Sequence, residues 1–219
     1  MKNSTNSMNI GNNTKTKKAF FIAVTIFSSL VVVLFLCELL LRLIPIPGIH
    51  VNSAKFDPII GDCFYPHSVS IYNNERGDSI KRKINSLGFL DREHKVDKSG
   101  SYRIGFFGDS FVAAQQVLLE NTFFILIENT LNNIGSDVEC LAFGVPHHGT
   151  LHAYLKSSLW VDHFDIDLVV YVFCENDLGD QIKEIKKSNL RPYAFLDDGF
   201  KIDNSFIGEN SYKEKNYTK

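Results

Sequence analysis

The sequence predicts an α/β protein in which a three-layer, flavodoxin-like parallel sheet follows one N-terminal transmembrane helix. Two observations predict this arrangement. Residues 19–37 form a stretch of 19 residues without a charged side chain, and strand-like and helix-like segments alternate after residue 100. Short, almost continuously apolar strands that alternate with helices are typical of a parallel sheet covered on both faces.

The composition restricts the class of protein further. The chain has 219 residues, of which 44% are hydrophobic and 22% are charged, and its formal net charge is -2. This is the balance of a globular protein. It argues against a disordered chain, a fibrous repeat and a nucleic-acid binder that depends on bulk positive charge.

Residues 19–44 are predicted to be a transmembrane signal anchor. At ~1.5 Å per residue, the uncharged stretch nearly spans a hydrocarbon core of ~30 Å. Pro45 and Pro47 then end the helix. A cleaved signal peptide is the alternative, but no A-x-A-like site of small residues follows, and the stretch is longer than a typical h-region. We therefore expect an uncleaved anchor.

The charges before the anchor predict its orientation. Residues 1–18 contain no acidic residue and four lysines, Lys2, Lys15, Lys17 and Lys18. The positive-inside rule keeps such a segment cytoplasmic. We expect a single-pass protein of the cell (inner) membrane whose remaining residues are extracytoplasmic.

The part beyond the membrane divides into three segments by composition. Residues 45–100 are polar and rich in turn signals, which predicts a connector without a long periodic segment. Residues 101–203 carry the strand and helix patterns of the domain, and residues 204–219 form a polar tail.

Within the domain, apolar runs predict strands and helical spacing predicts helices. We expect strands at 103–107, 138–143 and 167–174, helices at about 122–133 and 151–160, and a hairpin that turns at Asp198 and Gly199. Right-handed crossovers place the carboxyl ends of the three strands at one edge, where the functional loops of open α/β sheets gather.

A polar turn follows each predicted strand. The first is Gly108-Asp109-Ser110-Phe111, the second covers residues 144–150, and the third is Glu175-Asn176-Asp177. A serine at a strand-to-helix turn can hold its hydroxyl clear of the sheet beside a backbone N–H. Each turn alone is also compatible with a simple loop or a helix cap. Three such turns in order, each at a strand end, indicate one shared site.

These turns resemble the conserved blocks of the SGNH (GDSL-like) hydrolase superfamily, and in particular of its bacterial branch with an N-terminal membrane anchor. The resemblance extends from about residue 38 to residue 203 and rests on ELLLRL, NSLGF, FFGDSF, FGVPHHGT, VVYVFCEND and RPYAFLDDGF. It implies that Ser110 is the nucleophile. It also implies that a backbone N–H of the second block and the Asn176 side chain complete an oxyanion hole.

The second block departs from the family pattern N-x-G-V-x-G-x-G-T. Ala142 replaces the asparagine, and His147 stands where the family has a glycine. Gly144 and His147 are therefore both candidates for the residue whose N–H joins the oxyanion hole.

The family also has a downstream D-x-x-H block, which supplies the base that activates the serine. No such block follows Asn176 in this sequence. The D-x-x-H at Asp91–His94 precedes the serine, and we expect it on the surface. His147 or His148 could replace the base only within ~3 Å of the serine hydroxyl, and we expect both to be exposed loop residues.

With three strands where the family has about five, we interpret the domain as a C-terminally truncated, incomplete SGNH fold.

By resemblance, the chain is a membrane-anchored serine esterase or acyltransferase without metal or organic cofactor. Its expected substrates are acyl or O-acetyl esters, for example of extracytoplasmic carbohydrate, and no nucleic-acid partner is expected. The alternative is a truncated, catalytically inactive domain, that is, an anchored binding module or a gene fragment. A phosphate or nucleotide binder of flavodoxin type is a weaker possibility because no G-x-G-x-x-G or P-loop pattern is present.

Overall fold

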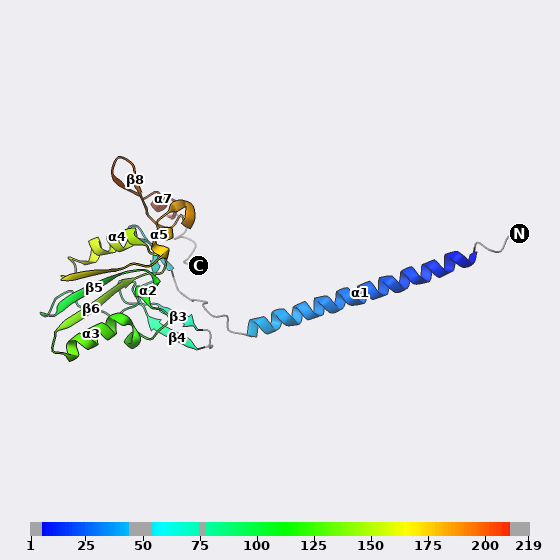
Figure 1. Cartoon of the computed structure of the whole chain (residues 1–219), viewed down its shortest axis with the longest axis horizontal. Helices are drawn as coiled ribbons and strands as arrows, with labels where there is room; N and C mark the ends of the chain where they lie inside the picture. The colour runs from blue at the N-terminus through cyan, green and yellow to red at the C-terminus, as the bar shows by residue number, and fades with distance from the viewer. Residues whose placement is uncertain (1–5, 44–53, 75–77, 211–219) are drawn as a thin grey trace. The chain divides into compact units, whose positions relative to one another are not determined.

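The computed structural model describes residues 6–43, 54–74 and 78–210. The chain divides into two compact units, Met1–Ile46 and Pro47–Lys219, both drawn in Figure 1. The first contains one long helix, and the second contains the predicted sheet.

The helix α1 spans Asn6–Leu43. Its segment Lys15–Arg42 contains an 18-residue stretch with a mean hydropathy of 2.8 and is long and apolar enough to cross a membrane, although a signal sequence meets the same criteria. The helix starts well before the predicted residue 19. Near its end, Arg42 Nε donates to Glu38 Oε1 over 2.9 Å. The predicted helix stop at Pro45 and Pro47 falls outside the described residues.

The core of the second unit is a parallel sheet of three strands, which confirms the three predicted strands. The central strand β5 (Tyr102–Gly108) lies between β6 (Val138–Gly144) and β7 (Leu168–Val172). Gly108 at the end of β5 is level with Gly144 and Val172. The carboxyl ends of all three strands therefore share one edge.

Helices lie on both faces of this sheet, as Figure 1 shows for α3 (Phe123–Asn133) and α4 (Thr150–Trp160). Alternate residues of β5 point to opposite faces. Phe106 packs in a core with Phe124 of α3, and Phe107 packs in a second core with Ala153 of α4. Burial on both faces explains why the strand sequences are almost continuously apolar.

The predicted connector contains two antiparallel hairpins that the sequence analysis did not identify. β1 (Ala54–Asp57) pairs with β2 (Gly61–Phe64), and β3 (Val69–Asn73) pairs with β4 (Ser79–Lys83). The guanidinium of Arg82 in β4 donates to backbone carbonyls at the end of the helix that begins at Ser110. The described part of the connector, residues 54–74 and 78–100, is therefore an integral part of the folded unit.

The remaining elements are short. They are α2 (Ser110–Ala113), the 3-10 helix η1 (Leu119–Asn121), α5 (Asn176–Asp180), α6 (Lys183–Lys186), β8 (Tyr193–Leu196), β9 (Phe200–Asp203) and α7 (Phe206–Asn210).

The hairpin of β8 and β9 turns at Asp198 and Gly199, as predicted, with φ angles of 49° and 114°. The predicted polar tail is folded at its start. The buried ring of Phe206 packs edge-on against Phe56, with 5.6 Å between ring centroids. Residues 211–219 of the tail lie outside the described part of the chain.

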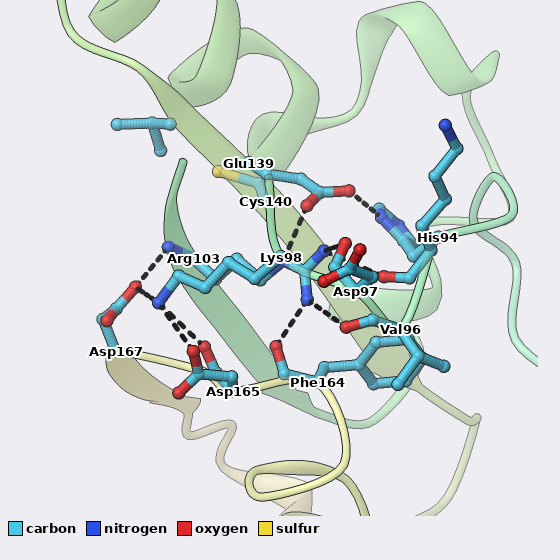
Figure 2. A network of polar contacts seen from close by, with 12 residues as sticks. His94, Val96, Asp97, Lys98, Arg103, Glu139, Cys140, Phe164, Asp165 and Asp167 are labelled. Carbon is cyan, nitrogen blue, oxygen red and sulfur yellow. Dashed lines mark hydrogen bonds and ion pairs between the residues drawn. The ribbon is translucent and has the colours of Figure 1, made fainter. Parts of the chain in front are cut away.

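A buried polar network joins the amino-terminal part of the sheet to the segment before β5, as shown in Figure 2. At its centre, Arg103 of β5 donates to Glu139 of β6 over 2.8 Å. The remaining N–H groups of its guanidinium donate to the carbonyls of Lys95, Val96, Asp97 and Phe164. These hydrogen bonds offset the cost of burying the charged guanidinium of Arg103.

The D-x-x-H sequence at Asp91–His94 belongs to this network, so the prediction that it lies on the surface is wrong. The side chains of Asp91 and His94 are only 1% and 4% exposed. His94 Nε2 is 2.9 Å from Asp91 Oδ2, and its Nδ1 is 2.7 Å from Glu139 Oε1. Asp91 also accepts the N–H of Ala142, which holds the pair against β6. Both ring nitrogens of His94 are therefore bonded to carboxylates.

These contacts predict a pH-dependent contribution of His94 to stability. Burial lowers the pKa of His94, but the hydrogen bond and charge of Asp91, together with the hydrogen bond of Glu139, outweigh burial and raise the pKa above its usual value. A group whose pKa is raised on folding stabilises the protein at pH values below its unfolded pKa. This stabilisation is lost as the pH rises through the folded pKa. His94→Gln should cost about 3 kcal/mol in the free energy of unfolding at pH 6, because it leaves the buried carboxylate of Asp91 without its cation.

Urea denaturation at pH 6 and pH 9 measures this effect. The difference between wild type and His94→Gln should shrink at the higher pH. His163→Gln, a change at an exposed histidine, serves as the control and should show no such trend. An equal difference at both pH values would contradict the assignment of a charged His94.

Candidate active site

The three polar turns predicted from the sequence meet at the carboxyl edge of the sheet. The first two strands end at Gly108 and Gly144, which are paired, and Val172 is level with Gly108 on the other side. The turns that follow therefore start from neighbouring positions.

Ser110 is the first residue of α2, and Asp109 is the N-cap of that helix. Asp109 Oδ1 accepts the N–H of Phe111 over 2.9 Å, so this carboxylate orders the turn. The hydroxyl of the half-buried Ser110 is 3.4 Å from Asp109 Oδ2 and donates to it.

Asn176 is the first residue of α5, whose N-cap is Glu175. Its Nδ2 donates to Asp109 Oδ2 over 2.9 Å and to Asp180 Oδ2 over 3.2 Å. Ser110 and Asn176 therefore donate to the same carboxylate oxygen, and the structure brings the two predicted residues together. Both hydrogens of the Asn176 amide have acceptors in this arrangement.

Gly144 lies directly against the helix of Ser110. A Cβ atom at this position would be 2.1 Å from the backbone N of Ala113 and 2.5 Å from the carbonyl carbon of Val112. Only glycine allows this approach of β6 to α2, so Gly144 has a packing role that is independent of its N–H.

His147 occupies the second turn and has a φ angle of 67°, in the left-handed region that glycine adopts without strain. The side chain is exposed, and its carbonyl accepts a hydrogen bond from the guanidinium of Arg191. Within the described residues, its N–H donates no hydrogen bond. The backbone therefore has the conformation expected at the family's glycine position, although the residue is histidine.

His148 and the nearby His152 are fully buried, so the expectation of an exposed loop residue holds for His147 and is wrong for His148. His148 Nε2 bonds to the carbonyl of Asp62 over 2.8 Å, which shows that β2 covers this loop. The His148 and His152 rings are 4.2 Å apart. Burial, reinforced by neighbouring cations, lowers the pKa of both well below 6.5. Within the described residues, no histidine bonds to the Ser110 hydroxyl.

Lys156 of α4 is a polar residue that the sequence analysis did not identify. It is fully buried, and its Nζ donates to the carbonyls of Gly108 and Phe143. Burial lowers its pKa to about 7, while the charges of Asp109 and Asp177 act in the opposite direction. The helical spacing could have predicted this burial, because Lys156 follows His152 by four residues on the face of α4 that packs on the sheet.

The structure contains few other features that suggest a ligand. Within the described residues, no three histidine, cysteine or acidic side chains lie close enough together to hold a metal ion. A cavity of about 660 Å³ is bounded by residues of the β3–β4 hairpin, the following segment and η1. Ser110, Gly144 and Asn176 do not line it.

The chain matches no protein-family model, and a comparison with curated proteins gives no significant match. Among solved structures, it is similar to a crystal structure of AlinE4, an SGNH-hydrolase family esterase, with 17% identity and a TM-score of 0.33. A structure of a mutant of that esterase gives 16% identity and the same TM-score. Each similarity covers 56% of this chain and 75% of the other. These values do not assign a family, so the function rests on the geometry of the site.

The packing of Gly144 makes a prediction about stability. Gly144→Ala should destabilise the protein by about 3 kcal/mol, because the new methyl group displaces the backbone of α2. Thermal or urea unfolding measures this. Gly179→Ala is the matched control, since its new Cβ would meet no atom closer than 3.8 Å. Equal stability of the two variants would contradict the described contact of β6 with α2.

The burial of Lys156 predicts a second pH dependence, of opposite sign to that of His94. Its folded pKa of about 7 lies below the ordinary lysine pKa of 10.5. Between these values the unfolded chain binds more protons, so the lysine's contribution to stability should rise with pH, by on the order of 4 kcal/mol. The measurement is urea denaturation of wild type and Lys156→Met between pH 6.5 and 10. A constant difference between the two would contradict a buried lysine with a lowered pKa.

Proposed function

We propose that this chain is a membrane-anchored serine esterase, or an acyltransferase, of SGNH type. The substrates would be acyl or O-acetyl esters of extracytoplasmic carbohydrate, and α1 would be an uncleaved anchor with a cytoplasmic N-terminus. The single observation that carries the proposal is the meeting of the Ser110 hydroxyl and the Asn176 amide at one oxygen of Asp109. A nucleophile beside a carboxamide donor is the arrangement that acyl transfer requires.

In the proposed reaction, Ser110 Oγ attacks the ester carbonyl carbon while its proton passes to a general base, a role that no described histidine fills. The base then gives that proton to the leaving alcohol. Water or a second alcohol takes the acyl group from Ser110, and its own proton returns to the Ser110 hydroxyl. The oxyanion receives hydrogen bonds from the Ser110 N–H, the Asn176 amide and an N–H of the second turn. Between Gly144 and His147, we favour His147 as that donor because its N–H is free within the described residues.

Asn176 must release one acceptor before it can donate to a substrate oxygen. Its bond to Asp180 is the longer of the two, at 3.2 Å against 2.9 Å for the bond to Asp109. We therefore propose that the substrate oxygen replaces Asp180 as the acceptor, while Asp109 keeps the amide in place.

A second candidate function is an anchored binding module without turnover. The observation that favours it is the lack of a histidine at Ser110 within the described residues. His94, of the D-x-x-H sequence, is bonded to carboxylates through both ring nitrogens. A serine hydroxyl without a base is a weak nucleophile, so such a site would bind esters without cleaving them.

Labelling with a fluorophosphonate probe distinguishes the two functions. The full chain in detergent should be labelled at Ser110, and Ser110→Ala should abolish labelling. Asn176→Ala should slow labelling by about 10²- to 10³-fold, because it removes one oxyanion donor. Mass spectrometry of the labelled peptide identifies the modified serine.

Ser158→Ala, a change at an exposed serine of α4, is the control and should label like wild type. A folded wild-type chain that is not labelled would overturn the esterase proposal in favour of the binding module. Acetate release from an O-acetylated polysaccharide then tests the substrate class.

A further inference from the structure

Lys156 is unusual in its position as well as in its burial. It comes from α4, on a face that also carries His152, and both side chains are fully buried. Lysine is almost never fully buried unless its ammonium has partners. Its partners here are main-chain carbonyls, which fixes the ammonium at a defined place in the sheet.

The two carbonyls that accept from Lys156 belong to the ends of adjacent strands. Nζ is 2.7 Å from the carbonyl oxygen of Gly108 and 2.6 Å from that of Phe143. Gly108 is followed directly by the turn of Ser110, and Phe143 is followed by the turn that contains His147. One ammonium group therefore joins the starting points of both turns.

The charges of two fully buried carboxylates also act on Lys156. Asp109 and Asp177 are 0% exposed, and neither forms an ion pair with a cation within the described residues. Both carboxylates act electrostatically on Lys156. Burial lowers the pKa of the nearby His148 and His152 well below 6.5, and the charge of Lys156 acts on both in the same direction. The lysine thus compensates charge where the sheet ends and the candidate site begins.

We propose that Lys156 is a positioning residue that holds the carboxyl ends of β5 and β6 together and thereby fixes the Ser110 turn relative to the second turn. This inference rests on the proposed function, because the position of Ser110 matters for acyl transfer. Lys156 is buried beneath the turns and does not touch the substrate. Its effect on the reaction is transmitted through two main-chain hydrogen bonds.

Hydrogen exchange of the full chain tests the positioning directly and does not depend on activity. In Lys156→Met, amides of residues 108–114 and 143–149 should exchange at least 10-fold faster than in wild type. Amides of α3 should change less than threefold, because a general loss of stability would accelerate them equally. Lys201→Met, the same change at an exposed lysine, is the control and should match wild type throughout.

The kinetics of fluorophosphonate labelling provide the second readout. Lys156→Met should lower the limiting rate constant of labelling by about 100-fold and leave the half-saturating probe concentration within twofold. If wild type is labelled and Lys156→Met is labelled at the same limiting rate, the inference is overturned. If wild type is not labelled, the proposed function fails, and the hydrogen exchange alone decides on the inference.

A second variant covers the case in which Lys156→Met does not fold. Lys156→Arg keeps the charge and the donors, and it should retain the protection of both turns within threefold of wild type. Fast exchange confined to the two turns of a folded Lys156→Arg would overturn the inference, since its donors and charge are still present. Equal exchange in folded Lys156→Met and wild type would overturn it as well.

Discussion

In a parallel sheet every strand ends at the same edge, and this constraint decides which side chains of this protein can meet. β5 pairs in parallel with both β6 and β7, so the turns that follow the three strands start side by side. Helices cover both faces and leave this edge for polar groups. For this reason Asp109 and Asn176, 67 positions apart in the chain, form a hydrogen bond.

Each end of the same sheet holds a buried basic side chain that donates to backbone carbonyls. Arg103 donates to one carboxylate and to backbone carbonyls near the amino ends of the strands, as Figure 2 shows. Lys156 donates to backbone carbonyls at the carboxyl ends. A buried charge is costly unless its hydrogen bonds are satisfied, so each cation favours one arrangement of the chain around it. The apolar middle of the sheet contains no such buried charge in its two cores, and close packing of the aromatic rings stabilises it.

The sequence predicts the elements whose periodicity is strong, and it fails where tertiary contacts decide. The strands, α3, α4 and the turn at Asp198 follow from local patterns. The hairpins of residues 54–83 do not, because Arg82 and Asp62 are held by distant backbone groups. The same limit applies to the site: the order of the turns predicts that Ser110 and Asn176 meet, whereas the burial of His148 depends on a cover by β2 that no local pattern reveals.

The side-chain hydrogen-bond donors of Ser110 and Asn176 already have acceptors within the protein, so a ligand has to replace one of these acceptors. The Ser110 hydroxyl and the Asn176 amide bind a carboxylate of the protein itself, and Asp180 accepts the second amide hydrogen. Under the proposed function, a substrate carbonyl would have to displace a carboxylate oxygen, which is a stronger acceptor because it is charged. The exchange becomes favourable when the substrate oxygen itself gains negative charge. Under the same proposal, these contacts favour an oxyanion over a neutral ester, and binding without attack would gain little from them.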